Sequence, residues 1–188
     1  MFLQMGLGRG FVVPLLATAM IASGASAALV AYSTVITNNT SAEKTYELTP
    51  MFTLTSNLGN TGGSGSLAIV VSDIRGGGAY IKSVGLTPIY TSFINAYQVA
   101  TLTPSDPLVP VEPFGQASFS AQFTEQNYGV QGNINDIIKM QLKFILSVGD
   151  QAVISATFEV NTFVPTPGAV ALIFMAGGFG VRGRRRSN

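Results

Sequence analysis

The chain contains no histidine, no cysteine and no tryptophan, and only 10% of its 188 residues are charged, against about 25% in an ordinary globular domain. Without histidine, imidazole acid–base catalysis, a Ser-His-Asp triad and an ordinary histidine zinc site are excluded. Without cysteine, disulfides, thiol catalysis and thiolate metal sites are excluded as well. The net charge of +1 is too small for a polybasic nucleic-acid binder, so we expect no nucleic-acid partner.

Charge is distributed unevenly along the chain. Five of the ten basic residues lie near the two ends, at Arg9 and within 182–186, whereas residues 28–163 hold the other five and all nine acidic residues. This central part therefore has a net charge of −4. A chain of this length allows one domain with appendages, so we interpret it as a mildly acidic domain between two apolar ends flanked by arginine.

The first 27 residues have the pattern of a secretory signal peptide. Arg9 supplies a weakly positive start, residues 11–21 are mostly apolar, and Ala25 and Ala27 place small side chains at positions −3 and −1 of a cleavage point before Ala28. The alternative is an uncleaved membrane helix, which needs roughly 20 apolar residues. Because the apolar run is shorter than that, we predict cleavage by signal peptidase after Ala27.

The other end combines three features in order. Two prolines in the segment 164–168 prevent a strand or helix from continuing, residues 169–181 contain no charge, and residues 182–186 are mostly arginine. Thirteen helical residues span roughly 20 Å, less than the roughly 30 Å hydrocarbon core, but arginine can extend the reach by snorkelling. The segment is apolar on every side, which favours a transmembrane helix with a cytoplasmic basic end over an amphipathic core helix.

This tail resembles the sorting signal of PEP-CTERM proteins, which has a Pro-x-Pro motif, an apolar helix and a terminal arginine cluster. The motif residues are Val164, Pro165, Thr166, Pro167 and Gly168, and the basic residues are Arg182, Arg184, Arg185 and Arg186. With Ala169 they match the Val-Pro-x-Pro-Gly-Ala variant of the motif, with threonine where the name-giving Pro-Glu-Pro has glutamate. The turn at 146–150 and the aromatic last strand containing Phe158, Glu159 and Val160 are also similar to small PEP-CTERM proteins.

The resemblance implies a bacterial protein that is exported, held in the membrane by its C-terminal helix, and cut near the motif by an exosortase, a membrane-embedded cysteine protease-transpeptidase. Its body is then released or transferred to another component of the cell envelope. The resemblance also implies an association with exopolysaccharide and biofilm. Signal peptidase and exosortase are therefore the expected partners, and exopolysaccharide is a candidate ligand.

Residues 28–163 alternate repeatedly between apolar and polar side chains, which is typical of half-buried strands. The predicted strands fall near 29–37, 46–54, 66–74, 79–84, 88–101, 117–124, 138–146 and 152–160. We therefore predict an all-β fold, an antiparallel two-sheet sandwich of about eight strands. The predicted core contains Phe119, Ile138, Met140, Leu142, Phe144, Ile154 and Phe158.

Turn signals separate the predicted strands. Glycine-rich stretches at 59–65 and 76–78 are expected to be loops, and Pro104–Pro113 cannot be a central strand. Ser147–Asp150 joins two strong strands, which predicts a hairpin over 137–161. A short helix near 133–137 is a weaker alternative to extended structure there. Asn38–Ser41 contains glycosylation sequons, but a bacterial source favours a turn.

Candidate catalytic groups are few. Neither glycine-rich stretch has a P-loop ending, and the carboxylates that a glycosidase would need are scattered over Asp73, Asp106, Glu112, Glu125 and Asp150. Glu47, Glu125 and Glu159 fall on the outward parity of strands. A cation site could assemble from Asp73, Asn133 and Asp136 only if loops far apart in the sequence meet. We predict no catalytic residue, no metal and no cofactor.

Three functions remain after these exclusions. The first is an exported, non-catalytic surface or extracellular-matrix protein, located in the cell envelope before sorting and at the surface or outside the cell afterwards. The alternative is a carbohydrate-binding β-sandwich, in which Tyr80, Tyr90, Phe93 and Tyr97 form an aromatic strip against sugar rings. A hydrolase is the least favoured, because histidine, cysteine and paired carboxylates are missing.

Overall fold

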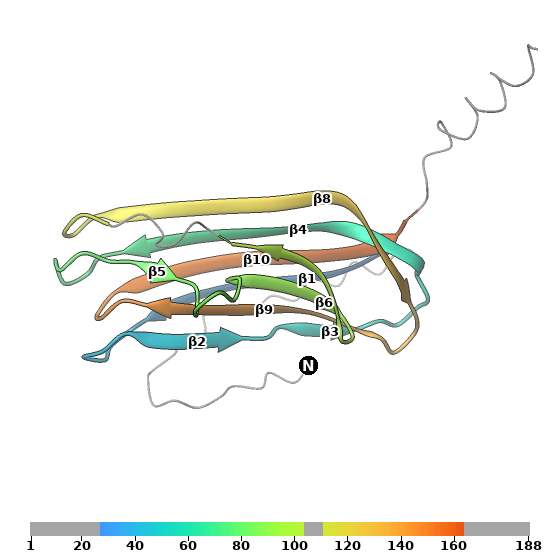
Figure 1. The fold of residues 1–188 in the computed structure, drawn as a ribbon, viewed down its shortest axis with the longest axis horizontal. Coiled ribbons are helices and arrows are strands. Elements are labelled where there is room, and N and C mark those ends of the chain that lie inside the picture. Colours follow the sequence, from blue (N-terminus) through green and yellow to red (C-terminus); the bar gives the residue numbers. More distant parts are fainter. Residues whose placement is uncertain (1–26, 104–110, 164–188) are drawn as a thin grey trace, which may run out of the picture.

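The computed structural model describes residues 27–103 and 111–163, and this part of the chain is all-β (Figure 1). Its strands form two antiparallel sheets, as the alternation predicted, and the described residues contain no helix. The alternative of a short helix near 133–137 is therefore wrong, because this segment is a turn before the strand that begins at Ile137.

The described part of the chain forms ten strands rather than about eight. The first sheet, called sheet A here, has the order β1-β10-β4-β8 and consists of β1 (Ala27–Thr37), β10 (Gln151–Thr162), β4 (Gly59–Ser72) and β8 (Gln116–Gly132). The second, sheet B, has the path β2-β9-β6-β7, with β3 and β5 also paired to β9. Its strands are β2 (Lys44–Leu48), β3 (Met51–Thr53), β5 (Ile81–Lys82), β6 (Tyr90–Ile94), β7 (Tyr97–Leu102) and β9 (Ile137–Leu146).

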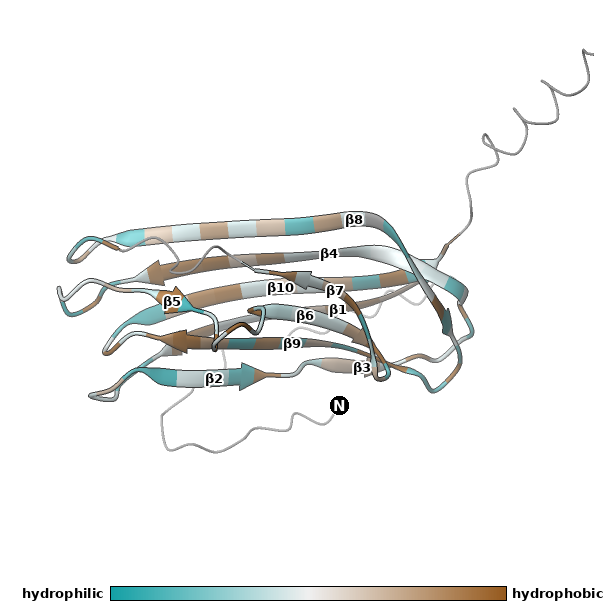
Figure 2. Cartoon of the chain, in the orientation of Figure 1, coloured by the Kyte–Doolittle hydropathy of each residue, from teal (hydrophilic) through white to brown (hydrophobic). Residues whose placement is uncertain are grey.

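One core lies between the two sheets. Alternate residues of each long strand point into it, which appears as alternating colour bands along β8 in Figure 2. Of the predicted core residues, Phe119 alone is half-buried, because it lies on the edge strand β8. The others are fully buried: Ile138, Met140, Leu142, Phe144, Ile154 and Phe158. This confirms the parity predicted for β9 and β10.

The predicted hairpin over 137–161 is wrong. β9 pairs with β2, β3, β5 and β6 in sheet B, whereas β10 pairs with β1 and β4 in sheet A. The turn between them therefore carries the chain across the core from one sheet to the other. Two of its side chains, Ser147 and Asp150, are buried at 3% and 1% exposed, whereas Val148 between them is 39% exposed.

The glycine-rich stretch 59–65 is not a loop but the first half of β4. Gly62 and Gly63 pair with Asn161 and Val160 of β10 on one side and with β8 on the other. A Cβ on Gly65 would lie 2.5 Å from the Phe123 ring. Glycine is therefore used here for close packing within a central strand, a role that composition alone does not distinguish from turn formation.

The other predicted strand and loop boundaries differ less from those of the structure. The predicted strand 88–101 is a hairpin of β6 and β7 with a turn at Asn95, which has a φ of 53°. The predicted strand 46–54 is divided at Pro50 into β2 and β3. The loop predicted at 76–78 is confirmed. Residues 104–110 lie outside the described part, and Val111 pairs with Ala79 through an isolated bridge.

The described domain begins and ends at the same end. Ala27, the first residue of β1, lies opposite Asn161, near the end of β10. We call this the proximal end; it is the right-hand end in Figure 1. The distal end holds the connections after β1, β4 and β9, including Asn38, Asp73 and the segment 147–150. The regular part of β10 separates the two ends by about 40 Å at roughly 3.4 Å per residue.

Candidate functional site at the distal end

The distal end gathers most of the buried polar side chains that the sequence places between strands. Asn38 follows β1, Asp73 follows β4, and Ser147 and Asp150 lie between β9 and β10. Their exposed fractions are 0%, 5%, 3% and 1%, respectively. A buried polar group destabilises the fold unless it is hydrogen-bonded, so the partners of these four side chains decide what this end can do.

Asn38 fixes the exit from β1. Its Nδ2 donates to the carbonyl oxygens of Ala42, Leu146 and Ser147 at 2.9, 3.0 and 2.9 Å. Its Oδ1 accepts from the backbone N–H and the hydroxyl of Thr40 at 3.1 and 2.7 Å. The amide thus binds the loop after β1 to the end of β9. The sequence predicted a turn at this position, and the buried asparagine is the residue that organises it.

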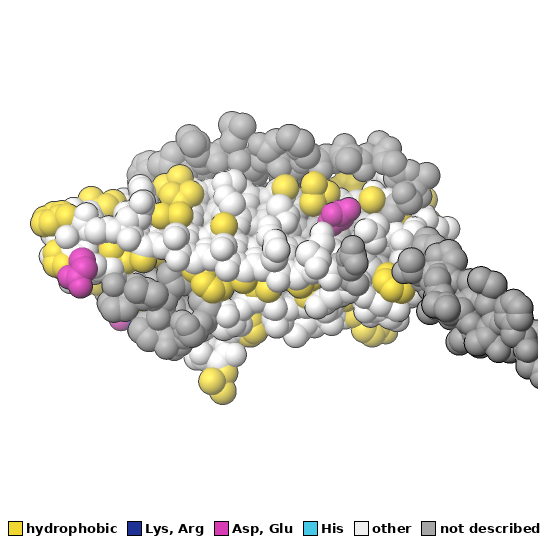
Figure 3. Space-filling model, turned by 90° about the horizontal axis from the view of Figure 1, so that it is seen from above, with side chains coloured by type: hydrophobic (Ala, Val, Ile, Leu, Met, Phe, Trp, Pro, Cys, Tyr) yellow, Lys and Arg dark blue, Asp and Glu magenta, His cyan; other side chains and the backbone are white. Residues whose placement is uncertain are grey.

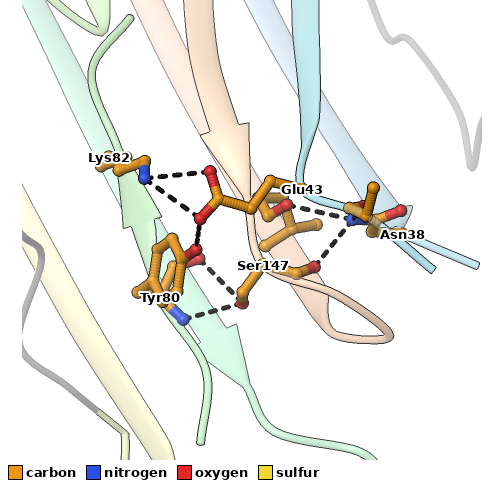
Figure 4. Close-up of polar contacts among 7 residues, drawn as sticks. Asn38, Glu43, Tyr80, Lys82 and Ser147 are labelled. Carbon is orange, nitrogen blue, oxygen red and sulfur yellow. Dashed lines mark hydrogen bonds and ion pairs between the residues drawn. The ribbon is translucent and has the colours of Figure 1, made fainter. Parts of the chain in front are cut away.

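Ser147 connects the end of β9 to the segment before β5. Its Oγ accepts the backbone N–H of Tyr80 at 2.9 Å and lies 3.1 Å from the Tyr80 carbonyl oxygen. On the solvent side, the hydroxyl of Tyr80 donates to Glu43, and Lys82 Nζ lies 3.0 Å from Glu43 Oε2 (Figure 4). The side chains of Lys82 and Glu43 are 31% and 45% exposed, so this ion pair contributes little to stability.

Asp73 holds the glycine-rich loop after β4 with both carboxylate oxygens. Oδ1 accepts from the backbone N–H of Arg75 at 2.9 Å and of Gly76 at 2.8 Å. Oδ2 accepts from the N–H of Gly78 at 2.7 Å and of Phe114 at 3.1 Å. Burial raises the pKa of Asp73, but these four donors more than offset that effect and lower the pKa to about 2.

Asp150 lies beside Asp73, a pairing that the sequence analysis missed. The Ser147 hydroxyl and the Asp150 Oδ2 form a short hydrogen bond. Burial raises the pKa of Asp150, the bond from Ser147 lowers it, and the nearby negative charge of Asp73 raises it. Two carboxylates from different loops therefore meet, but both are withdrawn from solvent. A glycosidase pair must contact its sugar, whereas Asp73 accepts backbone N–H groups and Asp150 is bonded to Ser147. The two carboxylates therefore have structural roles, each through its own hydrogen bonds.

We expect Asp73→Asn to make the thermal stability of the protein depend less on pH in the acid range. The folded pKa of about 2 lies below the ordinary 3.8, so the ionised group stabilises the fold above about pH 4. That contribution is lost as the pH falls toward 2. Thermal midpoints measured by circular dichroism between pH 2 and 7 should fall steeply in the wild type and less steeply in the variant. Glu112→Gln, which removes one exposed carboxylate, should keep the wild-type slope; equal slopes in all three proteins would contradict the assignment.

The aromatic residues of the carbohydrate-binding alternative are not brought together. Tyr90 is fully buried, and its hydroxyl donates to the carbonyl oxygen of Thr157. Phe93 is half-buried beneath Lys139 Nζ, 4.9 Å from the ring centroid. Tyr97 is 65% exposed in the β6–β7 hairpin at the proximal end, whereas Tyr80 is at the distal end. These four rings therefore form no strip on one face.

The three candidate cation ligands are also separated. Asp73 lies at the distal end, whereas Asn133 and Asp136 lie before β9 at the proximal end, where Asp136 Oδ2 accepts the backbone N–H of Asn133 at 2.7 Å. Residues 27–103 and 111–163 contain no group of three or more acidic side chains that could hold a metal ion. Among the other carboxylates considered, Glu112 and Glu47 are exposed and Glu159 is half-buried, and Asp106 lies outside the described residues.

The two predicted sorting signals fall almost entirely outside the described residues. Ala25, the motif 164–168, the apolar segment 169–181 and the basic residues 182–186 are all outside them. Ala27 and Ala28 begin β1, where they pair with Asn161 and Val160. Within the described ranges, no helix is long and apolar enough to cross a membrane.

Comparison with known proteins adds no further constraint. No protein-family model matches the chain, and no curated protein matches it. The features of the chain that bear on function are therefore the sequence patterns at its two ends and the geometry of the domain between them.

Proposed function

We propose that the chain is an exported, non-catalytic surface or matrix protein, sorted by an exosortase through its C-terminal tail. The proline motif, the apolar segment and the arginine cluster within 164–186 supply the sorting part of this proposal. The structural observation that supports it most is the pairing of Ala27 with Asn161. An N-terminal leader and a C-terminal tail would leave the domain side by side at its proximal end (Figure 1).

This placement suits a protein that is attached to a membrane at one or both ends during export. The proximal end would lie toward the membrane, and the distal end would extend about 40 Å away from it. The distal loops are held by hydrogen bonds between the side chains of Asn38, Asp73 and Ser147 and backbone groups of other residues. The connections at the distal end are thus fixed by internal hydrogen bonds, and the outer faces of the two sheets are available to the surroundings.

The order of events follows from the position of Ala27. In the folded domain its bond to Ala28 lies within the β1–β10 ladder, where pairing with Asn161 and Val160 holds this backbone against the domain. Signal peptidase would therefore act before β1 joins β10. The Pro-x-Pro motif differs, because it follows Phe163 and its prolines cannot extend the ladder of β10. An exosortase could therefore cut there after the domain has folded.

Mass determination of the exported protein tests the proposal. In a host with an exosortase, the mature chain should begin at Ala28 and end near residues 165–168. In an isogenic strain without the enzyme it should still end at Asn188. Changing both Pro165 and Pro167 to alanine should retain the full tail, whereas Pro113→Ala, at an exposed position in the domain, should be processed like the wild type. An intact Asn188 in both strains would contradict the sorting function.

A further inference from the structure

The outer strands of sheet A differ from ordinary edge strands. β1 has 11 residues and no charged side chain, and β8 has 17 residues with Glu125 as its single charge. Among residues 27–103 and 111–163, no strand pairs with the outer edge of either one. A long, uncharged edge presents a row of backbone N–H and C=O groups to which another strand can add.

Sheet B provides an internal comparison, because its edges carry the usual protection. β2 has only five residues, two of which are Lys44 and Glu47, and Pro50 interrupts this edge before β3. On the opposite side, β7 has six residues. Short strands, charges and prolines are the features by which proteins limit edge-to-edge association. The chain uses them in sheet B and omits most of them in sheet A.

The regular part of β8 is its distal half. Residues 116–123 pair with β4 in continuous register, whereas two register shifts interrupt the pairing beyond Phe123. The outward side chains of this half are Gln116, Ser118, Ser120 and Gln122, all exposed and uncharged. Figure 3 views the molecule from the side on which β8 is outermost, and its described surface is mostly uncharged, with acidic groups in small patches.

The incomplete burial of core residues on β8 also indicates that this edge can accept a partner strand. Ala117, Phe119 and Ala121 are only partly buried, although Ala117 and Phe119 pack against the core. The strand of sheet B on this side is the short β7. A strand added beside β8, together with its own inward side chains, would cover them further.

Strand direction indicates which edge would add to which. All three neighbouring pairs of sheet A, β1–β10, β10–β4 and β4–β8, are antiparallel. With four strands, β1 and β8 therefore run in opposite directions. A second copy in the same orientation would place its β1 antiparallel to β8 of the first, which continues the hydrogen-bonding pattern of the sheet without inversion.

We propose that copies of this chain associate edge to edge, β8 of one copy with β1 of the next, into a continuous sheet. A heterologous contact of this kind does not close on itself when its rotation does not complete a ring, so the product is a chain of copies. All copies would keep their proximal ends on one side. The association is a property of the folded domain and does not depend on whether an exosortase cuts the tail.

The partner side chains are compatible with such a contact. Ser33 on β1 is exposed and lies opposite Ser155 within the sheet, with their Oγ atoms 2.9 Å apart. Ser118 and Ser120 on β8 are side chains of the same kind. Pairs of small hydroxyl residues therefore already occur across neighbouring strands of this sheet, and the new junction would add more of them.

Lysine substitutions on the two edges test the proposal. The exported protein should form concentration-dependent oligomers in analytical ultracentrifugation. Ser33→Lys on β1 and Ser120→Lys on β8 should each weaken the association constant by about tenfold or more, because a charge is placed against an uncharged edge. Thr53→Lys, on the exposed edge of sheet B, adds the same charge and should have little effect. Unchanged thermal midpoints confirm that the variants fold.

Mixing the two variants distinguishes a heterologous contact from a symmetric one. Each variant keeps one intact edge, so an equimolar mixture of Ser33→Lys and Ser120→Lys should form heterodimers with wild-type affinity and nothing larger. A symmetric β8–β8 dimer would instead survive Ser33→Lys alone. If Ala68→Lys, on the outer face of sheet A, weakens association as much as Ser120→Lys, the sheets stack by their faces. Either result, or a wild-type protein that stays monomeric at millimolar concentration, would overturn the proposal.

Discussion

Truncation of Phe144 to alanine should lower the free energy of unfolding by about 3–5 kcal/mol. The side chain is fully buried on β9, the strand to which β2, β3, β5 and β6 all pair. Its ring stacks on Tyr46 of β2, with the centroids 5.6 Å apart. The substitution removes this aromatic contact and leaves a cavity at the centre of sheet B, where neighbouring strands are held by two ladders and cannot close around it.

Urea denaturation of the wild type, Phe144→Ala and Phe114→Ala would measure this effect. Phe114 provides a matched control, because the same ring is removed from a position that is 76% exposed. We expect it to cost less than about 1 kcal/mol, as for most exposed substitutions. Equal losses for the two variants would mean that the parity assigned to β9 is wrong, since a shift of one residue exchanges its two faces.

Parity is the part of the fold that the sequence predicts well. The alternation in 138–146 and 152–160 identified inward residues such as Met140 and Ile154, because a half-buried strand leaves a period of two in its own side chains. The partner of a strand leaves no such trace. Apolar and polar side chains alternate in β9 and in β10, as they would in the two strands of a hairpin, yet the two strands belong to different sheets. The pairing of each strand with its own sheet shows that the turn between them passes from one sheet to the other.

The candidate site was less predictable for the same reason. Asp73 and Asp150 are 77 positions apart, and nothing local to either indicates that the two loops meet. Asp73 did carry a usable signal, since an aspartate that follows a strand and precedes three glycines is well placed to accept backbone N–H bonds. The prediction of an aromatic strip between residues 80 and 97 was wrong for the opposite reason. These rings are close in sequence, but the β6–β7 hairpin does not place them side by side.

Substitution of Gly63 by alanine should lower the free energy of unfolding by about 2–5 kcal/mol, because overpacking and backbone strain act together. Gly63 has a φ of +154°, and a Cβ there would lie 2.9 Å from the carbonyl carbon of Glu159 and still closer to its oxygen. The obstacle is backbone of β10 rather than a flexible side chain. β4 cannot move away from it, because β8 pairs with the other side of the strand.

Gly77→Ala separates this effect from the general cost of replacing glycine. Gly77 lies in the loop after β4, and a Cβ there would have no atom within 4 Å. Alanine at such a position restricts the unfolded chain and changes stability by at most about 1 kcal/mol, in the stabilising direction. In urea denaturation the free energy of unfolding of Gly63→Ala should therefore be well below that of the wild type. The free energy of unfolding of Gly77→Ala should equal or exceed the wild-type value. If both variants behave alike, the stretch 59–65 is the loop that its composition suggests, and the β4–β10 ladder does not include it.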